Sequence, residues 1–158
     1  MSAAPARHLL VVYHSRSGGT QSLADAAIAG ATSDDISDVE VRVARAFDAT
    51  VDDVRWCDGI VLGTPENFGY MSGALKDFFE RIYYALLEET RGLPYALFVK
   101  GGHDGEGAIR SVEKIVTGLA WKAALAPVLV VGDIDKAALE RCYELGITFA
   151  AGLEAGVF

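Results

Sequence analysis

The chain contains few cysteines and prolines, the residues that metal sites, redox-active dithiols and linkers between domains often contain. Only two of its 158 residues are cysteines, Cys57 and Cys142. Neither has a second cysteine or a histidine at the spacing of a zinc site or a redox-active dithiol. We therefore expect two reduced packing cysteines and no metal site. Only four prolines are present and no linker interrupts the chain, so a single domain over residues 1–158 is expected.

Positive charge is also scarce. Fourteen Lys and Arg residues stand against twenty-two Asp and Glu residues, which gives a formal net charge of −8. Such an acidic surface repels nucleic acids and anionic membranes, so neither is expected as a partner. No apolar run approaches the roughly 18–20 residues of a membrane-spanning helix. Because Met1–Arg7 is too short and too weakly apolar for a signal peptide, we expect a cytoplasmic protein without membrane insertion.

Strand-like and helix-like patterns alternate along the chain. Apolar runs predict strands over 8–13, 39–43, 59–63, 93–99 and 128–131, and helical periodicity predicts helices over 19–31, 72–88, 109–119 and 139–153. Residues 47–56 are expected to form a short helix or a turn. The last helix is expected to be broken or bent near Gly146. This alternation predicts a doubly wound α/β fold, with a parallel sheet and helices on both faces. Ligands of such sheets bind beyond the carboxyl ends of the strands.

The segment HSRSGGTQ, residues 14–21, connects the first predicted strand to the first predicted helix. Ser15, Ser17 and Thr20 place hydroxyl groups around two adjacent glycines, where the backbone can bend freely and approach a ligand closely. The free N–H groups and the positive dipole end of the helix lie at the same place. The segment therefore predicts an anion site, most naturally for a phosphate monoester. The alternative is an ordinary turn capped by Ser and Thr.

The spacing in this segment excludes two common phosphate motifs. It has no Gly-Lys pair for a P-loop, and its adjacent glycines do not fit the G-x-G-x-x-G fingerprint. The pattern Ser15-x-Ser17-Gly18-x-Thr20 instead resembles the [S/T]-x-[S/T]-G-x-T loop of flavodoxin-like proteins, which hold the phosphate of FMN without a lysine.

A second segment, GTPENFGYMSGALKDFF at residues 63–79, follows the third predicted strand. Burial does not easily explain Phe68 and Tyr70 on this loop, whereas a flat aromatic ligand does; the alternative is an aromatic lead-in to the next helix, packed in the core. The segment resembles the G-[TS]-P-x-x-[FY]-G-x-M-S-G-x-[LM]-K-x-F stretch of NAD(P)H-dependent FMN reductases and of tryptophan-repressor-binding-protein-type quinone reductases. Together with the phosphate loop, it identifies the chain as a member of the flavodoxin-like, FMN-binding family.

This resemblance implies a three-layer sandwich with a five-stranded parallel sheet in the order 2-1-3-4-5. The positions it assigns to FMN binding are Ser15, Arg16, Ser17, Gly18, Gly19 and Thr20 around the phosphate, Thr64, Pro65, Glu66, Asn67, Phe68 and Gly69 along the ring and ribityl chain, and Lys100, Gly101, Gly102 and His103 at the pyrimidine edge.

Glu66, Lys100 and His103 place ionisable side chains at positions expected beside the flavin. Glu66 departs from the small or basic residue often found at its place, and its charge is unfavourable beside a flavin phosphate unless the side chain points to solvent. Lys100 and His103 are the candidates for a catalytic side chain, because a donor near N1 and the O2 carbonyl stabilises the reduced flavin. The alternative for both is a solvated glycine-rich turn.

Two classes of function are compatible with these features. In a reductase, FMN accepts a hydride from NADH or NADPH and passes electrons to a quinone or another small acceptor. In a flavodoxin-type carrier, the acidic surface docks protein redox partners; a flavin-binding protein without turnover is a third possibility. The Met71–Gly73 match and the lack of an aromatic residue in 100–107 favour the reductase. A homodimer or tetramer is possible, although the chain lacks the long insertion of the tetrameric relatives.

Overall fold

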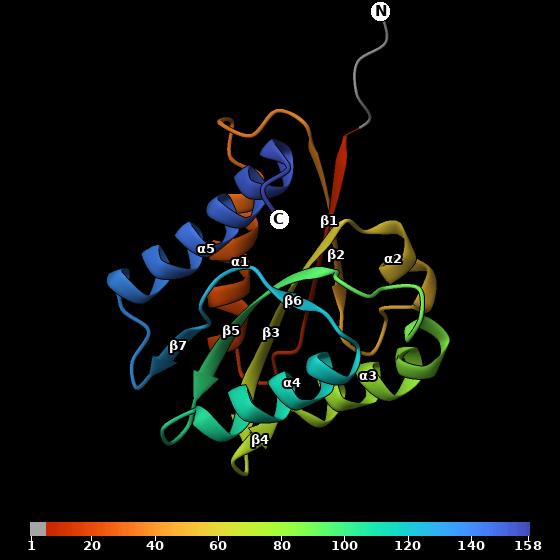
Figure 1. The fold of residues 1–158 in the computed structure, drawn as a ribbon. Helices are drawn as coiled ribbons and strands as arrows, with labels where there is room; N and C mark the ends of the chain where they lie inside the picture. The colour runs from red at the N-terminus through yellow and green to blue at the C-terminus, as the bar shows by residue number, and fades with distance from the viewer. Residues whose placement is uncertain (1–5) are drawn as a thin grey trace, which may run out of the picture.

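A central sheet covered by helices on both faces forms the fold (Figure 1). The structure is a computed structural model and describes residues 6–158. Residues 1–5 of the segment Met1–Arg7, in which no signal peptide is expected, lie outside the described residues. The elements are β1 (Arg7–Tyr13), α1 (Gly19–Ala31), β2 (Val39–Arg45), α2 (Val51–Trp56), β3 (Gly59–Asn67), β4 (Tyr70–Met71), α3 (Gly73–Leu86), β5 (Pro94–Gly101), α4 (Glu106–Gly118), β6 (Lys122–Ala123), β7 (Val128–Val131) and α5 (Lys136–Ala155).

The sheet has the strand order expected from the sequence. It runs β2-β1-β3-β5-β6, with all neighbours parallel, and β7 also pairs with β5. The predicted fifth strand therefore consists of two pieces, and its first piece, β6, was not predicted because a two-residue strand carries no periodic pattern. Pro127, which has no N–H to donate to a sheet, lies in the break between the pieces. β2 lies at one edge of the sheet.

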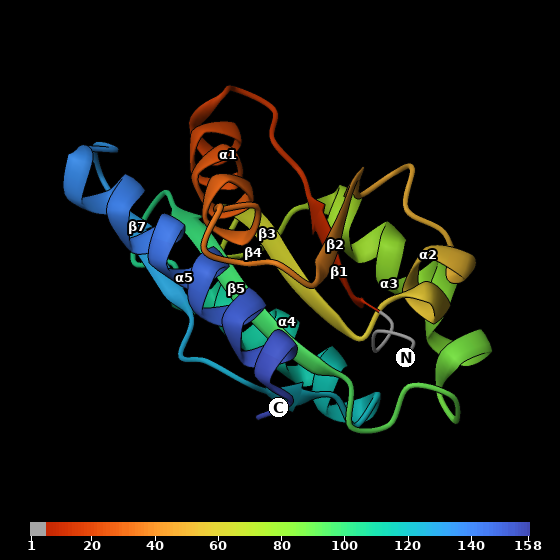
Figure 2. The same ribbon diagram turned by 90° about the horizontal axis from the view of Figure 1, so that it is seen from above.

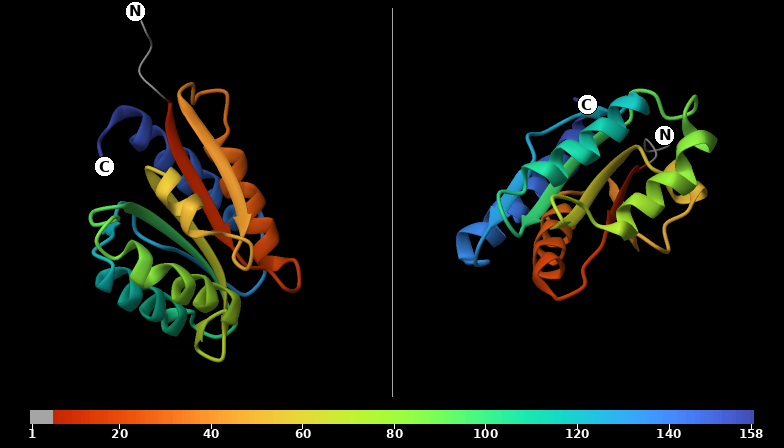
Figure 3. Two further views of the ribbon diagram at one scale, coloured as in Figure 1. Left: turned by 90° about the vertical axis from the view of Figure 1, so that its right-hand side faces the viewer. Right: turned by 90° about the horizontal axis from the view of Figure 1, so that it is seen from below.

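The two faces of the sheet bury separate cores. Alternate residues of β1 point to opposite faces, so that Leu9 and Val11 pack with residues of α1 and α5, whereas Leu10 and Val12 pack with residues of α3 and α4. Figures 2 and 3 show α1 and α5 on one side of the sheet and α2, α3 and α4 on the other. Within residues 6–158, every helix is too short or too polar to span a lipid bilayer.

The break predicted at Gly146 is wrong, because α5 is one continuous helix. The glycine serves a close contact with α1 instead. A Cβ atom on Gly146 would lie 1.9 Å from the carbonyl oxygen of Ala27, and one on Gly30 would lie 2.1 Å from the carbonyl oxygen of Tyr143. The two helices therefore approach backbone to backbone, and each contributes a glycine to the contact.

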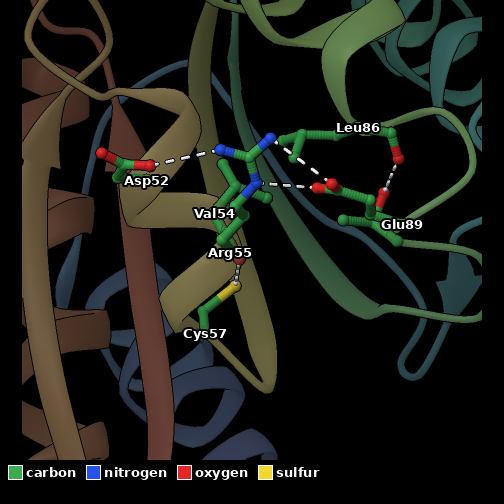
Figure 4. A network of polar contacts seen from close by, with 7 residues as sticks. Asp52, Val54, Arg55, Cys57, Leu86 and Glu89 are labelled. Atoms are coloured by element: carbon green, nitrogen blue, oxygen red, sulfur yellow. Dashed lines mark hydrogen bonds and ion pairs between the residues drawn. The ribbon is translucent and has the colours of Figure 1, made fainter.

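An ion pair connects α2 to the segment after α3 at the amino ends of the strands. Figure 4 shows the Arg55 guanidinium of α2 between Glu89, where Nε and Oε2 are 2.7 Å apart, and Asp52, where Nη1 and Oδ1 are 3.3 Å apart. Cys57 lies beside this cluster and donates its S–H to the carbonyl of Val54. Both cysteines are free and buried, as predicted.

The contact between α1 and α5 generates a prediction about stability. Replacing Gly146 with Ala should lower the free energy of unfolding by about 1–3 kcal/mol, because the added methyl group overpacks a backbone contact that cannot yield. Urea denaturation followed by far-UV circular dichroism measures this change. Gly73→Ala is the matched control, since a Cβ atom there meets nothing within 4 Å. A Gly146→Ala protein as stable as Gly73→Ala would contradict the interpretation.

Candidate functional site

Three loops meet at the carboxyl ends of the central strands. Tyr13 at the end of β1 is paired with Gly63 of β3, and Gly63 is paired with Phe98 of β5. On the carboxyl side of these paired residues, the chain continues into residues 14–18, 64–72 and 102–105. The parallel register therefore places side by side the three segments that the sequence singled out (Figure 3).

The first loop leads into a helix start that side chains cap only in part. Gly18 precedes α1 with a φ of 94°, and within the described chain no side chain caps the helix at this residue. Such a φ favours glycine. Ser15 accepts a hydrogen bond through Oγ from the N–H of Gln21 at 3.0 Å, so this serine acts partly as a turn cap. Ser17 is exposed and Thr20 is buried. The N–H groups and dipole of the first turn are the anion-binding feature of this loop.

Arginine side chains add positive charge beside this loop. Arg45, the last residue of β2, donates through Nη2 to the carbonyl oxygen of Ser15 at 2.7 Å, and its guanidinium lies 4.9 Å from the centre of the Tyr13 ring. Burial, followed by the charges of Arg45 and Arg16, lowers the pKa of His14 below its ordinary value. His14 therefore favours its neutral form more strongly than an ordinary histidine does. The sequence did not indicate Arg45, because only the pairing of β1 with β2 brings it to the loop.

The second segment is a β-hairpin rather than the expected loop. β3 continues to Asn67, beyond the predicted end at Gly63, and pairs antiparallel with β4 through Asn67 and Tyr70. The turn consists of Phe68 and Gly69, with φ values of 54° and 69°. Positive φ at both central residues is the requirement of a type I′ turn, which glycine and asparagine meet far more readily than phenylalanine.

Phe68 is fully exposed at the tip of this hairpin. The alternative of an aromatic lead-in packed in the core is therefore wrong for this residue. The exposed ring of Phe68 contributes no packing energy to the ligand-free protein, and its backbone φ is unfavourable. Exposed apolar side chains and strained backbone angles of this kind concentrate at ligand sites.

Buried hydroxyl groups hold the hairpin in place. The Thr64 hydroxyl accepts from the N–H of Ser72 at 2.9 Å and donates to the carbonyl of Pro65 at 2.8 Å. The Ser111 hydroxyl of α4 accepts from the N–H of Met71 at 3.1 Å. The side chain of Thr64 is fully buried, so it supports the hairpin from within instead of facing a ligand.

The side chain of Glu66 turns away from solvent and towards the third loop. Its Oε1 accepts from the N–H of Gly102 at 3.0 Å and from the N–H of His103 at 2.8 Å, and the residue is 9% exposed. The sequence left two orientations open for this charge, and the structure shows the one that does not point to solvent. The contact joins the hairpin to the third loop, residues 102–105, which is called the glycine-rich loop below.

A hollow of about 390 Å³ lies between the hairpin and the glycine-rich loop. Its lining residues are Glu66, Asn67, Phe68, Gly69, Gly102 and His103. All six were assigned to FMN binding from the sequence, and the structure brings them together. Lys100 lies nearer the first loop: its Cγ is 3.9 Å from the position of a Cβ on Gly19, and its Nζ donates to the carbonyl of Gly101. His103 is exposed at the rim.

Comparison with known proteins agrees with this architecture. The sequence profile of the NADPH-dependent FMN reductase family matches residues 20–134. A flavodoxin of Aquifex aeolicus (strain VF5) is 35% identical over 99 residues, which cover 63% of this chain and 52% of that protein. An NAD(P)H dehydrogenase (quinone) of Acidithiobacillus ferrooxidans (strain ATCC 53993 / BNL-5-31) is 33% identical over 93 residues, covering 46% of each chain.

The likeness extends to solved structures. A flavodoxin from the domain Archaea superposes with a TM-score of 0.80 at 25% sequence identity, covering 93% of this chain and 99% of that one. The chain spans about half the length of the two curated relatives it matches. The family profile covers most of the chain, including the hairpin and the glycine-rich loop. The chain therefore belongs to the NADPH-dependent FMN reductase family and has the flavodoxin-like fold that its sequence predicts.

Proposed function

We propose that this chain binds FMN at the carboxyl ends of β1, β3 and β5, and that it passes electrons from NADH or NADPH to a quinone or another small acceptor. The observation that carries the proposal is that a helix N-terminus preceded by an uncapped glycine and a hollow lined by Phe68 lie at the same edge of the sheet. When bound, FMN supplies the hydride and electron transfer chemistry. The chain's own residues bind and orient the cofactor.

The first loop fits the phosphate end of FMN. The start of α1 supplies N–H groups and a positive dipole end, and Ser17 supplies an exposed hydroxyl. Gly18 has open space where a Cβ would stand, so a phosphate can approach the backbone closely. The positive charges of Arg16 and Arg45 favour an anion at this place.

The hollow fits the ring end of the cofactor. Its volume of about 390 Å³ lies in the range of small-molecule sites. Phe68 of the hairpin and Gly102 and His103 of the third loop line it. The electron acceptor is proposed to be a small molecule. Neither a nucleic acid nor an anionic membrane is proposed as a partner, in keeping with a net charge of −8.

Two observations favour a reductase over a carrier. The loop over 101–107 contains no aromatic residue to cover the second face of the ring, which leaves that face open to a nicotinamide. The Acidithiobacillus relative is named as an NAD(P)H dehydrogenase acting on quinone. The relatives named as flavodoxins support the second candidate, an electron carrier that docks protein partners through its acidic surface.

The anion-binding role of the first loop is testable with a double variant. Ser17→Ala combined with Thr20→Val should weaken FMN binding about a hundredfold, because two hydrogen bonds to an anion contribute about 1.5 kcal/mol each. Quenching of flavin fluorescence measures the dissociation constant. The same two changes at the other end of α1, Thr32→Val with Ser33→Ala, form the matched control. Equal FMN affinity in the two double variants would remove the proposed phosphate site.

The turn residue Phe68 should show opposite effects on stability and on binding. Phe68→Asn should raise the free energy of unfolding of the apoprotein by about 1 kcal/mol, because asparagine accepts a positive φ at lower cost. The same variant should weaken FMN binding roughly fivefold through loss of the aromatic ring. Chemical denaturation and flavin titration measure the two quantities. Phe68→Tyr keeps the ring and should change neither, and a destabilised Phe68→Asn protein would refute the strain argument.

Anaerobic titration of the FMN-loaded protein distinguishes the two candidate functions. Addition of NADPH or NADH should rapidly bleach the yellow flavin absorbance, and addition of a quinone should restore it. The nucleotide that bleaches faster is the preferred electron donor. If neither nucleotide bleaches the flavin, and chemical reduction instead proceeds in two resolved one-electron steps, the carrier function is supported and the reductase function is ruled out.

A further inference from the structure

Glu66 occupies an unusual position for an acidic side chain. Its carboxylate lies in the wall of the hollow and is nearly buried. Through Oε1 it accepts two hydrogen bonds, from the N–H groups of Gly102 and His103. Among residues 6–158, Glu66 forms none of the ion pairs with a Lys, Arg or His side chain. Its negative charge is therefore balanced by backbone dipoles and not by a cation.

The two N–H groups that Glu66 engages belong to the loop expected at the pyrimidine edge of the flavin. Reduction of FMN places negative charge on that part of the ring, and free N–H donors there stabilise the reduced form. In this chain, two such donors are directed to a carboxylate instead. The carboxylate also brings a negative charge into the wall that faces the ring, where a low dielectric strengthens its repulsion of further negative charge.

We propose that Glu66 is a positioning residue that lowers the affinity of the bound flavin for electrons. It does so by fixing the glycine-rich loop, by engaging the N–H groups of Gly102 and His103, and by placing a negative charge beside the ring. The flavin then gives up its electrons more readily to an acceptor. This inference rests on the proposed FMN site and extends it to the redox potential of the bound flavin.

Two substitutions separate the charge of Glu66 from its hydrogen bonds. Glu66→Gln keeps an Oε1 acceptor of the same shape for both N–H groups but removes the charge. Glu66→Ala removes both the charge and the hydrogen bonds. Glu106→Gln is the matched control for net charge, because Glu106 is exposed at the start of α4 and does not line the hollow.

The decisive measurement compares the dissociation constants of reduced and oxidised FMN for each variant under anaerobic conditions. Glu66→Gln should lower the ratio of the reduced to the oxidised constant about tenfold, which corresponds to a rise of about 30 mV in the two-electron midpoint potential. Glu66→Ala should lower the ratio at least as far. Glu106→Gln should leave it at the wild-type value.

A second readout needs no flavin. In the apoprotein, hydrogen exchange at the amides of Gly102 and His103 should be faster in Glu66→Ala than in the wild type, and Glu66→Gln should remain close to the wild type. Unchanged exchange in Glu66→Ala would refute the tie between hairpin and loop.

The two proposals fail in different ways. If Glu66→Gln binds FMN with a wild-type ratio of the two constants, the inference about Glu66 is overturned while the FMN site stands. If the wild-type chain does not bind FMN, both are overturned.

Discussion

The position of β3 between β1 and β5 is the constraint on which the candidate site depends. Parallel pairing on both sides of β3 brings the carboxyl ends of three strands to one edge, so that each strand delivers its following loop to the same place. The close packing of α1 on α5 through Gly30 and Gly146 fixes the helix whose N-terminus faces this edge. The arrangement therefore builds a ligand site from segments that are locally simple turns.

Around this edge, the chain departs from what favours stability alone. Phe68 is exposed at a positive φ, and the carboxylate of Glu66 is nearly enclosed without an ion pair in the described part of the chain. The amino ends of the strands differ: there Arg55 is paired with two acidic side chains and burial raises the pKa of Cys57 to about 12, which leaves an unreactive thiol. Backbone strain and an unpaired carboxylate gathered at one edge of a sheet are typical of a scaffold that carries a site.

Most of the fold follows from the sequence because its elements have strong local patterns. The apolar runs of β1 and β3, the helical periodicity of α3 and the capping box of α2 at Thr50 each act over a few neighbouring residues. Three expectations were corrected where pairing or packing with another element decided the outcome. β3 continues past its apolar run because β4 pairs with it, α5 runs through Gly146 because α1 packs there, and the fifth strand is divided into two pieces.

The sequence by itself determined the alternation of strands and helices, the glycine-containing anion loop and the aromatic segment, because each is written in adjacent residues. Only the tertiary structure decided how these parts interact: Arg45 bonds to the carbonyl of Ser15, and Glu66 holds the amides of Gly102 and His103. These contacts join residues 30 to 37 positions apart. No local pattern encodes such pairs, because they depend on which strands become neighbours and on the register in which they pair.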